Sequence, residues 1–297
     1  LHPMRAWHQL SLCFAVVVAT AACVGERKSD WGESCDYSDH CESTLACYAK
    51  RCAPLNGTRT VTDAVGDLYE GVFKDGHMVS GHITHEAGGH SQGKFEKGLL
   101  VDGEHRDAEG VRTVGTFRRG RFVQGTRHAP DGTYATGDFE SNGLSKGVRS
   151  LADGTVETGL FAYGKLTKGQ RRHRDGRLLD GNFDDEGRLS CDECEMTTAE
   201  GDVIKGRFRK GRPKGKVHLK RADGAHFHGD LVDSEFEGDV RANLPDGSVL
   251  RGRMVDGGLL VGEKTLRGGG FEEGLFRRDK LVTGWRVDLV GNVTIVE

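Results

Sequence analysis

The stretch Tyr69-Glu70-Gly71-Val72-Phe73-Lys74-Asp75-Gly76 decides the fold, because its Gly–x–large-apolar triplet recurs through most of the chain. The triplet returns about every 22 residues. Its lead glycines are Gly71, Gly93, Gly115, Gly137, Gly159, Gly181, Gly206, Gly229, Gly252 and Gly274. A fixed period of this size predicts a repeat array, in which each unit buries its apolar face only against its neighbours.

Further glycines flank each triplet at constant offsets. One lies five residues before every lead glycine, often after an aspartate, as in Asp131-Gly132. In six units another lies five residues after the lead glycine, as in Asp75-Gly76. Asp-Gly between short apolar–polar alternations is the strongest local signal for a two-residue hairpin turn, because glycine adopts positive φ without steric cost. Each unit is therefore predicted to be two short antiparallel strands with a turn at both ends.

The turn position also predicts which residues face each other across the hairpin. With Asp75-Gly76 as the turn, Phe73 lies opposite Met78. The same count pairs Phe95 with Leu100, Phe117 with Phe122, Phe139 with Leu144, Phe161 with Leu166, Met254 with Leu259, and Phe276 with Leu281. The residues between them are mostly polar, which is typical of a sheet with one apolar and one wet face. About twenty strands at ~4.8 Å each give an all-β, elongated, twisted antiparallel array on the order of 95 Å long.

Tyr69-Glu70-Gly71, the following Phe73, Gly76 and Gly81 resemble the MORN repeat. The resemblance covers residues 64–290 and implies about ten MORN-like hairpins. Only the first unit keeps the tyrosine of the motif, so the array is a diverged one. The tyrosine position holds Ser91, Thr113, Ala135, Glu157, Leu179, Ile204, Phe227, Leu250 and Glu272 in the other units. Tandem cell-wall-binding hairpins are the alternative fold, but they need Trp/Tyr pairs in each unit and the array holds only Trp285 among tryptophans.

The first 22 residues have the pattern of a secretory signal. Met4-Arg5, expected to be the true start, is followed by an apolar run over 10–22 that is too short to span a membrane as a helix. Thr20-Ala21-Ala22-Cys23 resembles a bacterial lipobox, which implies cleavage and lipidation of Cys23. By analogy with lipoproteins, Val24 after the cysteine implies the outer membrane. Plain cleavage after Ala22 is the alternative.

The cysteine count agrees with an exported chain. Of eight cysteines, the signal removes Cys13, and six of the remaining seven can pair, leaving Cys23 as the odd one. After a tether over 23–34, residues 35–55 resemble a small secreted Cys-rich knot, which implies the pairs Cys35–Cys47 and Cys41–Cys52. A zinc site is the alternative there. Cys191 and Cys194 lie in the longest repeat interval, where we expect a disulfide closing an extended turn; a redox-active Cys-x-x-Cys is the alternative.

Charge gives only local signals. The net charge is −3, so composition predicts no nucleic-acid partner. One hairpin is strongly basic and makes a possible anion-binding set of Lys205, Arg207, Arg209, Lys210 and Arg212. The preceding hairpin is acidic, so mutual neutralisation is the alternative. His226 and His228 share a strand face and could share a metal ion, but two ligands do not make a selective site, and solvent-facing histidines are the simpler interpretation.

No motif for catalysis, cofactor binding or metal binding stands out, and nothing outside the array is long enough for a catalytic domain. We therefore expect no catalytic residues, no cofactor and no metal. The sequence predicts an exported, lipid-anchored outer-membrane repeat protein that acts as an interaction or structural scaffold for an envelope protein or surface polymer. Binding of an anionic glycan or lipid near residues 205–221 is the alternative, and a divergent enzyme is the third. Two open sheet edges would permit self-association, with the tail, including residues 291–297, as a C-terminal cap.

Overall fold

The computed structural model describes residues 45–48, 51–54, 56–63, 65–141, 143–278 and 280–297, and side chains from residue 56 onward. The predicted signal, Cys23 and most of the Cys-rich segment lie outside these ranges. Within them every regular element is a β-strand, and no helix has the length and apolarity to cross a membrane. The predicted all-β fold is confirmed.

Ten hairpins follow one another along the chain, one for each predicted unit. Their first strands are β4 (Leu68–Lys74), β6 (His90–Glu96), β8 (Arg112–Arg118), β10 (Tyr134–Glu140), β12 (Val156–Ala162), β14 (Leu178–Asn182), β16 (Val203–Arg209), β18 (His226–Val232), β20 (Val249–Val255) and β22 (Phe271–Arg277). Their second strands are β5 (His77–Thr84), β7 (Leu99–Arg106), β9 (Arg121–His128), β11 (Gly143–Ser150), β13 (Lys165–Arg172), β15 (Cys191–Thr197), β17 (Arg212–Lys220), β19 (Glu235–Asn243), β21 (Gly258–Thr265) and β23 (Lys280–Val287).

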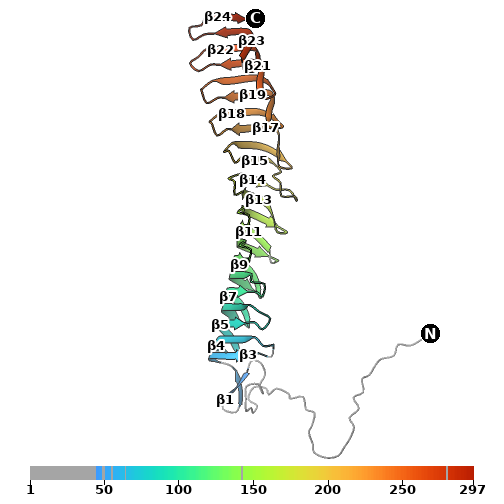
Figure 1. Cartoon of the computed structure of the whole chain (residues 1–297). Helices are drawn as coiled ribbons and strands as arrows, with labels where there is room; N and C mark the ends of the chain where they lie inside the picture. The colour runs from blue at the N-terminus through green and yellow to red at the C-terminus, as the bar shows by residue number, and fades with distance from the viewer. Residues whose placement is uncertain (1–44, 49–50, 55, 64, 142, 279) are drawn as a thin grey trace, which may run out of the picture.

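These hairpins form one continuous antiparallel sheet. Strand β3 (Gly57–Thr62) pairs with β4 at one end and β24 (Val293–Val296) pairs with β23 at the other, so the sheet has two strands more than expected. Each strand pairs with the next in sequence, and the molecule is a long, gently curved column one hairpin wide (Figure 1). A separate two-stranded sheet, β1 (Leu45–Tyr48) with β2 (Arg51–Pro54), precedes it and sets Cys47 opposite Cys52.

The predicted register across the Asp75-Gly76 type of turn is confirmed. Phe73 lies opposite Met78, and Asp75 and Gly76 have φ of 49° and 83°, as a type I′ turn requires. All seven predicted cross-strand pairs are present. Beyond each pair the register shifts by one residue, because Val79 and its equivalents form a β-bulge that adds local twist.

The turn at the other end of each unit differs from the predicted two-residue turn. In the loop between β9 and β10, the Ala129 N–H donates to the Thr133 carbonyl (2.8 Å) and the Gly132 N–H to the Ala129 carbonyl (3.1 Å), so the loop is longer. Gly132, with φ of 87°, closes it. The Asp131 carboxylate accepts a hydrogen bond from the Thr133 N–H at 2.9 Å, so this aspartate stabilises the backbone of the loop. Asp153, Asp223 and Asp246 accept the equivalent hydrogen bond in their loops.

These loop aspartates predict sensitivity to acid. Backbone hydrogen bonds hold the pKa of Asp131 and Asp153 below the ordinary 3.8. A depressed folded-state pKa contributes stability above the unfolded value that is lost as pH falls through the folded one. We expect the free energy of unfolding to drop between pH 4 and pH 2, and Asp153→Asn to reduce that drop, as measured by urea denaturation at a series of pH values. An unchanged slope in this variant would contradict the assignment.

A column of glycines runs along the sheet. Gly71 lies opposite Gly81, Gly81 opposite Gly93, and the row continues through strand after strand to Gly181. It is interrupted from β15 to β19, where Val217 and Val240 take the place of glycine on the second strands, and resumes from Gly252 to Gly284. Where glycine faces glycine, neighbouring strands approach one another at backbone contact, with no side chain between them.

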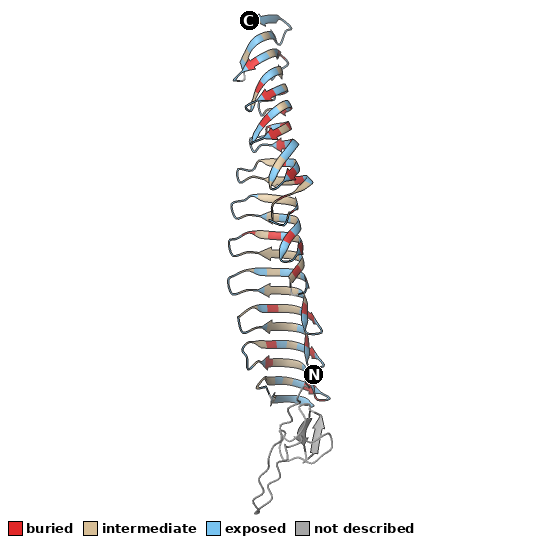
Figure 2. Ribbon diagram, turned by 90° about the vertical axis from the view of Figure 1, so that its right-hand side faces the viewer, coloured by how far each residue is buried: buried red, intermediate tan, exposed pale blue. Residues whose placement is uncertain are grey.

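The core lies on one face of the sheet, on either side of the glycine column. In most first strands, the residues two before and two after the lead glycine are buried, as with Ser91 and Phe95 around Gly93. Since residues two apart share a strand face, both project inward. Buried positions thus form columns along the whole length of the array (Figure 2). The apolar inner face is confirmed for the Phe–Leu column.

Both outer edges of the long sheet stay unpaired in the part of the chain that the structure describes. The predicted C-terminal cap contains β24, which extends the sheet instead of covering it. Val290 and Ile295 at this end are 82% and 74% exposed, which leaves an apolar edge open to contact.

Candidate functional site: the inner groove

The inner face carries a second column beside the Phe–Leu column, and this one is mixed in chemistry. It consists of the residue two before each lead glycine and the residue opposite it. In the middle of the array arginines occupy it: Arg127 lies opposite Thr113 and Ala135, Arg149 opposite Glu157, and Arg171 opposite Glu157 and Leu179. The 22-residue spacing of the three arginines was the available sequence signal, and the sequence-based interpretation missed it.

Arg149 and Arg171 each cross the inner face of the next unit. The Arg149 guanidinium lies 5.1 Å from the centre of the Phe161 ring and donates to the Gly164 carbonyl in the turn (2.7 Å). Arg171 lies 4.8 Å from the centre of the Phe183 ring and donates to the Gly187 carbonyl (2.5 Å). Each side chain thus runs across the inner face from the loop end of its strand to a turn, and a cation–π contact and a charge-assisted hydrogen bond hold it there. We call these two side chains the arginine struts.

Glu157 joins the two struts. Its side chain is 3% exposed and accepts hydrogen bonds from both guanidinium groups, at 2.9 Å from Arg149 Nε and 2.8 Å from Arg171 Nε. A carboxylate this deeply buried must be paired, because desolvation of an isolated charge is costly. The tyrosine position of the motif therefore holds the centre of an ion network in this unit.

Arg127 occupies the same position one unit earlier, between two aromatic rings. Its guanidinium lies 5.7 Å from the Phe122 ring centre and 5.3 Å from the Phe139 ring centre. Burial lowers the pKa of Arg127 from its ordinary value, and the Asp107 charge acts in the opposite direction. The pattern common to the three arginines is a cation held over the aromatic floor of the inner face.

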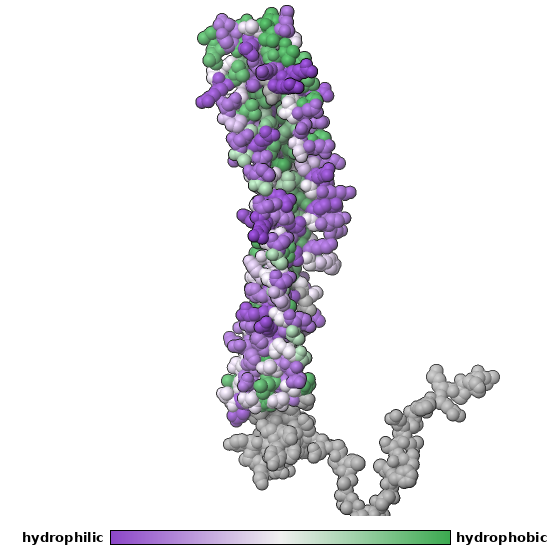
Figure 3. Space-filling model, in the orientation of Figure 1, coloured by the Kyte–Doolittle hydropathy of each residue, from purple (hydrophilic) through white to green (hydrophobic). Residues whose placement is uncertain are grey.

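Toward the C-terminus the same inner face is open. A groove of about 600 Å³ crosses units eight to ten. Its floor is apolar, formed by Phe227, Phe236, Leu250, Met254, Leu259 and Phe276. Its rims differ in charge, with Glu235 and Asp256 beside the turns and Arg221 and Lys264 beside the loops. Apolar surface shows between hydrophilic side chains toward the C-terminal end in Figure 3. Apolar walls with a few polar groups are typical of binding sites.

The first two units contain a chain of hydrogen bonds that resembles a catalytic relay. Asp67 binds His85 Nδ1 (2.8 Å), His85 Nε2 binds Ser91 Oγ (2.9 Å), and Ser91 Oγ also binds His105 Nδ1 (2.9 Å). The hydrogen bond from His85 lowers the pKa of Asp67, and burial lowers the pKa of His105. A nucleophilic serine needs space for its substrate and donors for the oxyanion. Ser91 is 6% exposed and held from both sides, so we interpret the chain as a link between the units.

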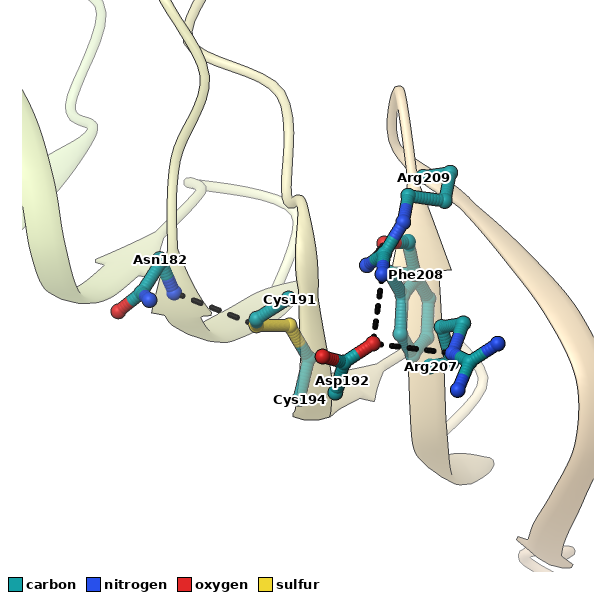
Figure 4. The surroundings of a disulfide bond; sticks show 7 residues. All are labelled: Asn182, Cys191, Asp192, Cys194, Arg207, Phe208 and Arg209. Atoms are coloured by element: carbon teal, nitrogen blue, oxygen red, sulfur yellow. Dashed lines mark hydrogen bonds and ion pairs between the residues drawn. A yellow bond between two sulfur atoms is a disulfide. The ribbon is translucent and has the colours of Figure 1, made fainter.

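The Cys191–Cys194 disulfide is present, but its place differs from the prediction. It lies in a bulge at the start of β15, where Cys191 faces Phe208 and Cys194 faces Gly206, and not in the extended turn. The Asn182 N–H donates to Cys191 Sγ at 3.3 Å (Figure 4). A side chain at Gly181 would meet the two sulfur atoms at 2.5 and 2.8 Å. The disulfide therefore fills the glycine column where a second-strand glycine is missing.

The extra residues of the longest repeat interval are taken up before the disulfide. Phe183 and Leu189 form a bridge that closes the loop between them. Cys194 is 4% exposed and no helix begins at Cys191. Both observations favour a structural disulfide over a redox-active pair. The other predicted disulfides cannot be compared, since Cys35 and Cys41 lie outside the described residues.

The predicted anion-binding set is largely engaged within the chain. Lys205 pairs with Glu195 (2.7 Å), and Asp192 pairs with both Arg207 (2.9 Å) and Arg209 (2.6 Å). These acids come from the neighbouring strand β15, and the Asp192 pairs are visible in Figure 4. The geometry therefore favours mutual neutralisation. Of the other two cations, Lys210 lies in the turn between β16 and β17 and Arg212 begins β17, and neither makes an ion pair with a described residue.

The two histidines considered for a metal site, His226 and His228, lie on the outer face. His226 and His228 are both exposed, and the His228 ring lies against that of His218 of β17, with ring centres 4.1 Å apart and the ring planes tilted by 33°. Among the described residues, no group of three or more His, Cys, Asp or Glu side chains could hold a metal ion. The contact that this cluster makes is a ring–ring contact across neighbouring strands.

No family model and no curated protein matches this chain. Among solved structures it is similar to the SAS-4 (dCPAP) TCP domain of Drosophila melanogaster, in complex with a proline-rich motif of Ana2, at 13% identity and a TM-score of 0.29, over 66% of this chain and 90% of that one. The TCP10 domain of Danio rerio CPAP matches at 15% identity and a TM-score of 0.20, over 84% of this chain and 96% of that one. Virginiamycin B lyase from Staphylococcus aureus matches at 11% identity and a TM-score of 0.15, over 86% of this chain and 85% of that one. Likeness at this level does not bear on function.

Proposed function

We propose that the chain is a non-catalytic, exported and lipid-anchored repeat protein of the bacterial envelope, which presents its array as a scaffold for a protein partner. The observation that carries the proposal is the open groove on the inner face of units eight to ten. The 22 strands from β3 to β24 extend roughly 100 Å at ~4.8 Å per strand. An anchor at Cys23 would place this groove far from the membrane surface.

The distribution of charge supports a protein partner over an anionic polymer. Lys205, Arg207 and Arg209 are already paired with acids of β15, so a polyanion would have to compete with ion pairs of this chain. The groove, in contrast, combines an apolar floor with acidic and basic rims. Apolar centres with polar rims are typical of protein interfaces.

The proposal is tested by fractionation and cross-linking in the same cells. Metabolic labelling with a palmitate analogue should label the wild-type chain, and Cys23→Ser should lose both the label and the membrane fraction. Photo-cross-linking from a residue at the groove rim should capture one dominant protein in intact envelopes, whereas cross-linking from Lys94, an exposed outer-face residue, should not. An unlabelled, unexported wild-type chain would contradict the anchored scaffold.

A further inference from the structure

The inner groove is bridged in the middle of the array and unbridged near its C-terminal end. Arg149 and Arg171 cross it, each held over an aromatic ring and bonded to a turn carbonyl of the next unit. In later units the equivalent position, opposite the residue two before the lead glycine, holds Leu219, Ala242 and Lys264. Leucine and alanine cannot donate a hydrogen bond, so no side chain of this column reaches the turns of units eight and nine. Arg221, from the loop before β18, covers only the Phe227 ring, 4.9 Å from its centre.

The groove occupies the place where the strut from Ala242 would lie. By the pattern of Arg149 and Gly164, a strut from position 242 would end at Gly257, which lines the groove. By the pattern of Arg127, which lies between Phe122 and Phe139, it would pass over Phe236 and Met254, which also line it. Among the described residues, no side chain donates a hydrogen bond to the Gly257 carbonyl.

The turn side of the groove is negatively charged. Glu235 and Asp256 line it beside Gly257, and neither makes an ion pair with a described residue. Two carboxylates, a free turn carbonyl and an apolar floor together match a guanidinium on an aliphatic stem. A carboxylate or a phosphate would be repelled at this rim and attracted only to Arg221 and Lys264 on the opposite one. An acyl chain would leave the polar groups of the rim without partners.

We propose that this groove binds an arginine side chain of an extended partner peptide, which supplies in trans the strut that Ala242 cannot provide. The guanidinium lies over Phe236 and Met254 and donates to the Gly257 carbonyl and the Glu235 and Asp256 carboxylates. Apolar residues of the same peptide cover Leu250 and Phe276 on the groove floor. This inference rests on the proposed role as a protein-interaction scaffold and names the partner's recognition element.

The test uses the immobilised full chain and five degenerate peptide pools, X-X-B-X-X, in which B is Arg, Lys, citrulline, Glu or Leu. The Arg pool should be retained at least fivefold over the citrulline pool, because citrulline keeps the shape and loses the charge. Preferential retention of the Leu pool would show a purely apolar site and would overturn the proposal, as would equal retention of all pools.

Two variants locate the binding. Glu235→Gln with Asp256→Asn should remove the Arg preference, whereas Asp75→Asn should keep it, because Asp75 has the same turn position and a φ of 49° against 50° for Asp256. Phe227→Thr with Ala242→Arg and Leu250→Ala copies the surroundings of Arg127 and should close the groove in cis, ending retention in a chain that circular dichroism shows to be folded. Retention by this folded variant would also refute the groove as the site. If the Arg pool is retained but no protein is captured in intact envelopes, the groove stands as an arginine-binding site and the envelope role is rejected.

Discussion

Gly115→Ala is expected to destabilise the third unit by about 3 kcal/mol or more. A Cβ at this position would lie 2.1 Å from the Gln124 carbonyl oxygen and 2.8 Å from the Gly125 Cα. Both atoms are backbone, so the two strands must separate for the methyl group to fit. The φ of +149° adds strain for any L-residue. Overpacking costs about 1–3 kcal/mol and a strained φ about 1–3 kcal/mol.

Gly132→Ala is the matched control for this prediction. Gly132 also has positive φ, at +87°, but a Cβ there meets no atom within 4 Å. Its replacement should cost only the conformational strain, about 1–2 kcal/mol. Urea denaturation, combined with hydrogen exchange to follow individual units, measures both, since a repeat array can unfold in parts. Equal losses in the two variants would show that close strand approach at the glycine column is unimportant.

Glu157→Leu is expected to cost about 3 kcal/mol, although leucine or isoleucine occupies the same position in other units. The substitution leaves Arg149 and Arg171, which are 22% and 17% exposed, without their shared carboxylate. Removing one partner of a buried ion network costs about 3–5 kcal/mol. The partial exposure of the arginines places the loss at the lower end, and thermal and urea unfolding would measure it.

Two comparisons separate the buried network from ordinary surface charge. Glu104→Gln removes a more exposed pair with Arg112 and should cost less than about 1 kcal/mol. Combining Arg149→Met, Glu157→Leu and Arg171→Met should recover most of the loss, because Met196 and Leu179 show that the column accepts apolar side chains. A triple variant as unstable as the single one would contradict the pairing as the cause.

The hairpins and their register could be predicted from the sequence because they depend on local signals. Asp75-Gly76 fixes a turn, and a turn fixes that Phe73 meets Met78. The longer loops could not be recognised, since Asp131-Gly132 reads as the same dipeptide; there the aspartate bonds to Thr133 and the glycine ends a wider turn. A dipeptide does not encode the number of residues that the loop encloses.

The site was harder to predict, because it depends on contacts between units. Arg149, Glu157 and Arg171 are eight and fourteen residues apart in sequence and meet only when successive strands pair. Charged residues in a strand are normally assigned to the wet face, and this assumption concealed the struts. The basic hairpin was visible in the sequence, yet its neutralisation by Asp192 depended on how β15 pairs with β16.

The constant register of the glycine column has a consequence for how such a chain can evolve. Because Gly103 meets Gly115 across one unit boundary as Gly125 meets Gly137 across the next, a duplicated or deleted unit rejoins its neighbours without a change of face. Each such event would lengthen or shorten the column by two strand spacings, roughly 10 Å. The length of the molecule can therefore change in steps of one repeat unit, and the distance between its two ends can evolve without a change in the residues of the groove.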